Sequence, residues 1–112
     1  MLIKKSQYCF LISLLFLLSS CSDDKNYSES YLRGKRIYKA NCVKCHNNNP
    51  SKIGVLAPNI AGASLETIQS MLLYGKPPEG QKPIWDHVEM DPLPHLINEA
   101  SFLFEYIDSF KK

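Results

Sequence analysis

A pentapeptide near the middle of this 112-residue chain constrains its fold more than any other feature. Residues 42–46 read C-V-K-C-H, the C-x-x-C-H pattern through which haem is attached to proteins by two thioether bonds. Cys42 and Cys45 lie about one helical turn apart, so both sulfurs can reach the vinyl groups on one edge of a porphyrin. His46 directly follows, where its imidazole can bind the iron. The motif therefore predicts one covalently attached haem c.

Two other chemistries also use paired cysteines. A zinc site would need a second pair of Cys or His ligands, and His87 and His95 are too far apart for the usual H-x3–5-H pair. A thioredoxin-like redox pair usually opens a helix after a strand, and no such strand pattern is visible here. Zinc binding and dithiol chemistry stay open as alternatives to haem attachment.

The first twenty residues are typical of an export signal. A pair of lysines precedes an apolar run over residues 10–18, which suits a signal peptide and is short for a membrane span. The run ends in L-S-S-C, which resembles the lipobox of bacterial lipoproteins, in which the cysteine is acylated. We therefore predict a signal peptide over residues 1–20, a lipid anchor on Cys21, and a location on the periplasmic face of a bacterial membrane. The alternative is an ordinary secretory signal that contains a cysteine.

The remaining chain is long enough for one domain. Residues 21–30 are polar and predict a short tether, which leaves residues 31–112 as the folded domain. Without the signal, the chain carries 11 basic and 11 acidic side chains. This balance does not indicate a nucleic-acid-binding protein.

The domain is predicted to be all-α. Three stretches combine helical spacing of apolar residues with a preceding capping residue: Tyr31 to about Asn41 after Ser30, Leu65 to Tyr74 after Ser64, and a final helix after Asn98. Gly34 in the middle of the first helix is unfavourable unless another element packs closely against it, so we expect a tight helix crossing there. Residues 76–94 are rich in proline and lack periodicity, and such a long irregular stretch usually wraps around something.

A helix running into C-x-x-C-H, a methionine in a proline-flanked loop about forty residues later, and an aromatic C-terminal helix together resemble class I, monohaem cytochromes c. The resemblance covers residues 31–110. It implies a small fold of three to four helices around one haem, in which the first and last helices cross where a glycine faces an aromatic residue. Gly34 and Tyr38 on one side, with Leu103 and Tyr106 on the other, match that crossing.

By the same resemblance, His46 is the proximal iron ligand, and its inner ring nitrogen binds the carbonyl group of Pro58. Met90 is the matching sixth ligand, and a thioether opposite histidine suits an electron carrier. The family often has proline directly after this methionine, whereas here Asp91 intervenes. Other residues could take the sixth position, or it could be open; the alternatives are His87, His95 and Met71.

Further residues are implied to surround the haem. Trp85 either donates its indole N–H to a haem propionate or simply fills the core. The apolar residues expected to line the crevice and exclude water from it are Val55, Leu56, Ile60 and Leu93.

The resemblance implies a membrane-tethered one-electron carrier rather than an enzyme, which meets its protein redox partners in short-lived contacts. One alternative is a permanently bound cytochrome subunit of a larger dehydrogenase or oxidase. A haem enzyme with an open iron position and a zinc-bearing structural lipoprotein are two further alternatives.

Overall fold

The computed structural model describes residues 26–86 and 88–112. The predicted signal peptide, Cys21 and His87 lie outside these residues. All regular structure in the described part is helical, in four elements along the chain: α2 (Glu29–Asn41), α3 (Leu65–Tyr74), the 3₁₀ helix η2 (Pro94–Glu99) and α4 (Ala100–Asp108). The predicted all-α class is confirmed.

Helix α2 begins earlier than predicted and ends at Asn41 as predicted. Ser28, not Ser30, is the N-cap, and its hydroxyl accepts a hydrogen bond of 3.1 Å from the backbone N–H of Tyr31. The same hydroxyl donates to the carboxylate of Glu105 in α4 at 2.6 Å. Ser28 and Ser30 are both suitable caps by sequence, and Ser28 makes an additional hydrogen bond to a distant helix.

Helix α3 has the predicted bounds and caps. The Ser64 hydroxyl accepts a hydrogen bond of 3.1 Å from the N–H of Thr67, which satisfies one of the free donors of the first turn. Gly75 ends the helix in a left-handed conformation with φ of 67°, and its N–H donates to the carbonyl of Met71 at 2.9 Å.

The start of the last helix differs from the prediction, because Asn98 is not its N-cap. Pro94 opens η2, which runs directly into α4 at Ala100. No side-chain hydrogen bond caps α4; instead the N–H of Ala100 donates to the carbonyl of Ile97 in the preceding 3₁₀ turn. The 3₁₀ turn therefore supplies acceptors that a capping side chain would otherwise provide.

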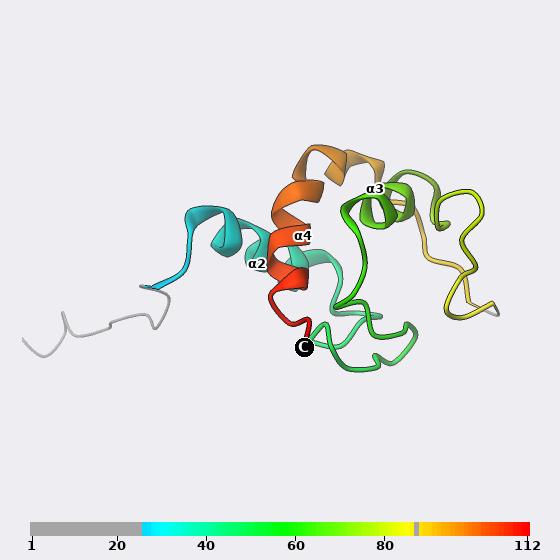
Figure 1. The fold of residues 1–112 in the computed structure, drawn as a ribbon, viewed down its shortest axis with the longest axis horizontal. Coiled ribbons are helices and arrows are strands. Elements are labelled where there is room, and N and C mark those ends of the chain that lie inside the picture. Colours follow the sequence, from blue (N-terminus) through cyan, green and yellow to red (C-terminus); the bar gives the residue numbers. More distant parts are fainter. Residues whose placement is uncertain (1–25, 87) are drawn as a thin grey trace, which may run out of the picture.

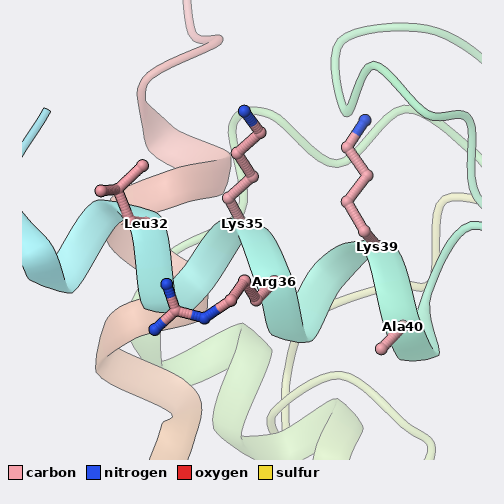
Figure 2. A pocket seen from close by; sticks show the side chains of 5 residues that line it. All are labelled: Leu32, Lys35, Arg36, Lys39 and Ala40. Atoms are coloured by element: carbon pink, nitrogen blue, oxygen red, sulfur yellow. The ribbon is translucent and has the colours of Figure 1, made fainter. Parts of the chain in front are cut away.

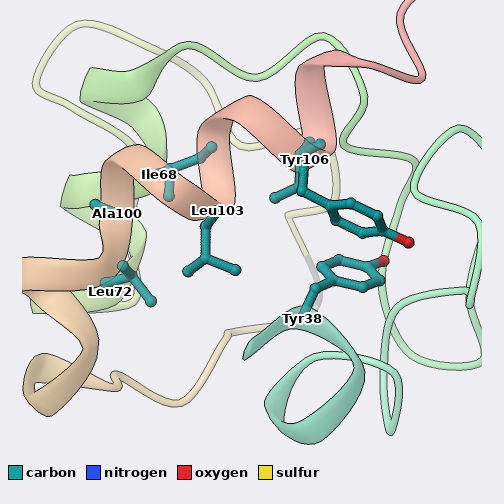
Figure 3. Close-up of a cluster of buried hydrophobic side chains, with 7 residues drawn as sticks. Tyr38, Ile68, Leu72, Ala100, Leu103 and Tyr106 are labelled. Atoms are coloured by element: carbon teal, nitrogen blue, oxygen red, sulfur yellow. The ribbon is translucent and has the colours of Figure 1, made fainter. Parts of the chain in front are cut away.

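Helices α2 and α4 cross in the centre of the molecule, and α3 packs against the other side of α4 (Figure 1). At the crossing, a Cβ on Gly34 would overlap the backbone carbonyl of Phe102, which confirms the predicted tight crossing. The rings of Tyr38 and Tyr106 lie 5.3 Å apart across it. The buried core cluster, most of it drawn in Figure 3, consists of Tyr38, Ile68, Leu72, Ala100, Leu103, Tyr106 and Ile107.

Two long irregular segments complete the domain. Residues 42–64 connect α2 to α3 near the C-terminal end of the chain (Figure 1). The second segment, residues 75–86 and 88–93, extends beyond α3 at the right of Figure 1. The N–H of Leu93 donates to the carbonyl of Leu72 at 2.8 Å, which ties the end of the second segment to α3. The C-x-x-C-H motif begins the first segment, and Met90 lies near the end of the second.

Candidate haem-binding site

The C-x-x-C-H motif forms one tight turn that directly continues α2. The N–H of Cys42 still donates to the carbonyl of Tyr38 at 2.9 Å, as in a helix. The carbonyl of Cys42 then accepts hydrogen bonds from Cys45 at 3.3 Å and His46 at 2.9 Å. Both cysteines and the histidine are therefore held on a single turn, as attachment to one edge of a porphyrin requires.

The two cysteines are unpaired but differ in their surroundings. Cys42 is half-buried, whereas Cys45 is exposed, and neither forms a disulfide. Burial raises the pKa of the Cys42 thiol to about 11, and the neighbouring Cys45 contributes in the same direction. At neutral pH the Cys42 side chain is therefore a thiol rather than a thiolate.

His46 is oriented by a backbone carbonyl. Its Nδ1 atom lies 3.4 Å from the carbonyl oxygen of Pro58, the contact implied by the family resemblance. A carbonyl oxygen can only accept, so Nδ1 carries the proton and Nε2 keeps the lone pair that can bind a metal. Burial lowers the pKa of His46 against the opposing effect of the Pro58 contact. The ring is therefore favoured in the neutral form, which iron ligation needs.

Backbone hydrogen bonds fix the loop that carries Pro58. The N–H of Leu56 donates to the carbonyl of Cys45 at 3.1 Å, so the loop folds back onto the motif itself. The N–H of Ile60 donates to the carbonyl of Pro50 at 2.9 Å and closes the loop on the other side of Pro58. The acceptor for His46 thus belongs to a loop whose two ends are both anchored.

Met90 lies in the second segment and is half-buried against the core cluster. Its backbone carbonyl contacts Gly75, at the point where α3 ends. Trp85, in the same segment, is half-buried as well. Among the alternative ligands, Met71 is a half-buried residue of α3 and His95 is an exposed residue of η2.

The expected crevice-lining residues fall into two groups. Ile60 and Leu93 are half-buried and pack against the core cluster. Val55 and Leu56, in contrast, are 85% and 53% exposed, so the protein itself does not bury them. Exposed large apolar side chains recur in the second segment, at Ile84 and Val88. Both ligand-bearing segments thus present apolar surface that a flat apolar group could cover.

One hollow in the described part of the chain does not involve the motif. It measures about 480 Å³ and follows one face of α2 (Figure 2). The residues that line it are Leu32, Lys35, Arg36, Lys39 and Ala40. None of the candidate haem-binding residues takes part, so we do not include this hollow in the site.

Taken as a donor set, the residues fit covalent haem. Cys42 and Cys45 supply two unpaired thiols on one turn, His46 supplies a neutral imidazole with one nitrogen engaged, and Met90 supplies a thioether. Within residues 26–86 and 88–112, no group of three or more His, Cys, Asp or Glu side chains is arranged to hold a metal ion. The described residues therefore do not support the zinc alternative.

Charge is divided unevenly along the domain. Residues 26–52, which include the motif, carry six basic side chains and one acidic side chain. Residues 53–112 carry four basic and eight acidic side chains. The near-zero total therefore conceals a positively charged part of the chain around the haem-attachment motif.

Sequence reasoning missed one contact beside His46. The hydroxyl of Tyr38 donates to the backbone carbonyl of Asn47 at 2.6 Å. The sequence predicts only that Asn47 lies in a turn. The available signal was the hydroxyl of Tyr38, because a tyrosine placed in a core needs a hydrogen-bond partner.

Comparison with known proteins gives one match. The family model described as Cytochrome c matches residues 31–101, from the third residue of α2 to the second residue of α4. The matched stretch includes the C-x-x-C-H motif, Pro58 and Met90. No curated protein and no solved structure matches the chain significantly.

Proposed function

Since the chain belongs to the cytochrome c family, we propose that it is a membrane-anchored one-electron carrier of the class I, monohaem type, with iron bound by His46 and Met90. The family attaches haem c covalently, and the cysteines that do so here are Cys42 and Cys45. Family members generally carry electrons rather than transform substrates. The bound haem supplies one-electron chemistry, in which its iron alternates between the ferric and ferrous states.

The observation that carries this proposal is the orientation of His46. The turn of the motif fixes its backbone, and the Pro58 carbonyl fixes its ring through Nδ1. A ligand held at both points keeps its direction when the charge of the metal changes. Low reorganisation of this kind suits electron transfer, and the hydrogen bond to Nδ1 also increases the basicity of the ligating nitrogen.

Met90 is the favoured sixth ligand because of where it is held. It lies half-buried beside the core, whereas His95 is exposed on η2. Met71 belongs to the regular helix α3, whose neighbours Ile68 and Leu72 are buried in the core. A methionine in an irregular segment can direct its sulfur toward a cofactor more readily than one in a packed helix.

Absorption spectra of the purified holoprotein, oxidised and reduced, test the proposal. We expect covalently held low-spin haem in the wild type and loss of the sulfur-ligand signature in Met90→Ala. Met71→Ala is the matched control and should keep that signature. An unchanged Met90→Ala spectrum would refute the Met90 assignment, and a high-spin wild type that readily takes up added ligands would favour the open-iron alternative.

We also propose that Cys21 is acylated and holds the domain at the periplasmic face of a membrane. No helix in the described part of the chain is long and apolar enough to cross a membrane. Only residues 22–28 separate Cys21 from α2, and seven residues span at most about 25 Å. Mass spectrometry of the membrane-extracted protein should show a chain that begins at Cys21 and carries acyl chains, whereas an unmodified Cys21 would refute the anchor.

Transient docking with redox partners is the proposed mode of exchange. The excess of basic residues around the motif favours partners with an acidic surface. The alternative, a permanently bound subunit, draws support from the exposed apolar residue Ile84 in the second segment, which is 73% exposed. Purification in mild detergent separates the two: a stable complex supports the subunit, and a free monomer supports the carrier.

A further inference from the structure

We propose that Tyr38 is a positioning residue for the haem ligand His46, acting through a hydrogen bond to the backbone of Asn47. The inference rests on the proposed role of His46 as an iron ligand. It gives Tyr38 a task beyond filling the helix crossing, because a phenylalanine would pack there equally well but could not form this bond.

The first step is the contact itself. Tyr38 is fully buried, with none of its surface exposed, and its hydroxyl donates to the Asn47 carbonyl at 2.6 Å. The ring of Tyr106 in α4 packs over one face of the Tyr38 ring, with the ring centroids 5.3 Å apart (Figure 3). Burial raises the pKa of Tyr38, so its hydroxyl keeps the proton that it donates. The bond therefore joins a rigid core residue to the loop.

The second step is the set of hydrogen bonds around Asn47. Its backbone carbonyl accepts from Tyr38, and its side-chain oxygen accepts from the N–H of Asn49 at 2.9 Å. Its side-chain amide donates to the carbonyl of Ile53 at 3.2 Å. Three bonds in different directions thus hold the residue that directly follows His46.

The third step is the path from the core to the ligand. The backbone N–H of His46 donates to the carbonyl of Cys42, and the carbonyl of Pro58 orients the His46 ring through Nδ1. Asn47 fixes the chain on the C-terminal side of His46, and Tyr38 connects that point to the crossing of α2 with α4. Without the Tyr38 hydroxyl, the Asn47 carbonyl would lose its buried partner and the loop would be free to shift.

The test compares Tyr38→Phe with wild type as holoproteins, by amide hydrogen exchange and by the midpoint potential. The loop amides of Asn49, Gly54 and Leu56 should exchange about tenfold faster in the variant, the expected effect of losing one hydrogen bond. Amides of α3 should be accelerated less than those of the loop, and the potential and the His46 imidazole NMR signals should shift. Tyr31→Phe is the matched control, because its ring packs against the same Tyr106, at 5.2 Å, and against Tyr27, at 4.2 Å.

A second variant protects the test against failure of the first to fold. Asn47→Ala keeps the carbonyl but removes the bonds to Asn49 and Ile53, and it should accelerate exchange of the same loop amides. Equal acceleration in the loop and in α3, or unchanged loop exchange, would overturn the proposal, as would an unchanged potential in Tyr38→Phe. A wild type without histidine-bound haem would instead refute the proposed function, while the exchange comparison would still report on the Tyr38 contact.

Discussion

Gly34 of α2 lies directly against the backbone carbonyl of Phe102 in α4. A Cβ at this position would also come within 3.0 Å of the Cβ of Tyr106, so two groups of α4 occupy the space that a side chain would need. Neither neighbour is the flexible end of a side chain, and α4 is itself held by the core cluster. The absence of a side chain at Gly34 therefore sets the distance between the two crossing helices.

We predict that Gly34→Ala destabilises the protein. Alanine is the better helix former by about 1 kcal/mol, but overpacking of a rigid contact costs about 1–3 kcal/mol, and here the contact is with backbone. We expect the free energy of unfolding to fall by up to about 2 kcal/mol in denaturant titrations. Gly62→Ala is the control, because a Cβ there meets nothing within 4 Å. Equal stability of the two variants would contradict a space requirement at the crossing.

A second prediction concerns Gly75 and the proposed ligand Met90. A Cβ on Gly75 would overlap the Met90 carbonyl and approach Pro92 Cδ at 3.4 Å. Gly80 also has a positive φ, 85° against 67° for Gly75, but a Cβ there meets nothing within 4 Å. Both substitutions to alanine carry the cost of the left-handed conformation, and only Gly75→Ala also displaces Met90.

The measurement is the sulfur-ligand absorption signature of the oxidised holoprotein. Gly75→Ala should weaken it or shift the midpoint potential, and Gly80→Ala should leave both unchanged. If the two variants behave alike, the end of α3 does not position Met90.

Local signals made part of this fold predictable from sequence. Helix α3 was predicted to the residue, because a serine cap, apolar residues at helical spacing and a terminal glycine all agree there. The crossing at Gly34 was predictable because a glycine inside a helix is unfavourable without close packing. The motif turn was predictable because attachment of haem restricts its residues and their order.

The sequence-based predictions failed where the structure depends on a contact between distant residues or on a competing local structure. Ser28 and Ser30 are both suitable caps, and the hydrogen bond from Ser28 to Glu105 joins residues 77 positions apart. Asn98 has the chemistry of a cap, but Pro94 starts a 3₁₀ turn that makes a side-chain cap unnecessary. The contact between Tyr38 and Asn47 likewise depends on how the loop folds back, which periodicity does not reveal.

A third prediction follows from the buried tyrosines. Burial raises the pKa of Tyr38 and of Tyr106 above the ordinary value near 10. Above pH 10 the unfolded chain has released these protons while the folded protein still holds them, so the free energy of unfolding falls as pH rises. The stability present below pH 10 is thus lost progressively on the alkaline side, by about 1.4 kcal/mol per pH unit for each such group at most.

Denaturant titrations between pH 9 and 11 check this dependence. Tyr38→Phe is less stable at neutral pH, because it lacks the bond to Asn47, but its stability should fall less steeply above pH 10. Tyr74→Phe, which removes the hydroxyl of a ring that is 68% exposed, is the control and should keep the wild-type slope. Parallel curves for Tyr38→Phe and wild type would show that Tyr38 does not titrate with unfolding.

A fourth prediction uses the uneven charge of the chain. The motif lies within residues 26–52, which have a large excess of basic side chains, so anionic reagents should be attracted to that side. We expect the oxidation rate by hexacyanoferrate(III) to fall with ionic strength, and the rate with a cationic cobalt complex to rise, because salt screens attraction and repulsion alike. Stopped-flow spectroscopy of the reduced holoprotein measures both rates.

Charge-removing variants locate the effect. Lys44→Gln with Lys52→Gln removes two exposed charges near the motif and should slow the anionic reagent several-fold at low salt. Lys76→Gln with Lys82→Gln removes the same charge from the acidic part of the chain, where we expect a smaller change. Because the net charge of the two double variants is identical, equal rates would mean that the reagent responds to net charge alone. A larger effect at Lys44 and Lys52 would instead place electron exchange on the basic side that carries the motif.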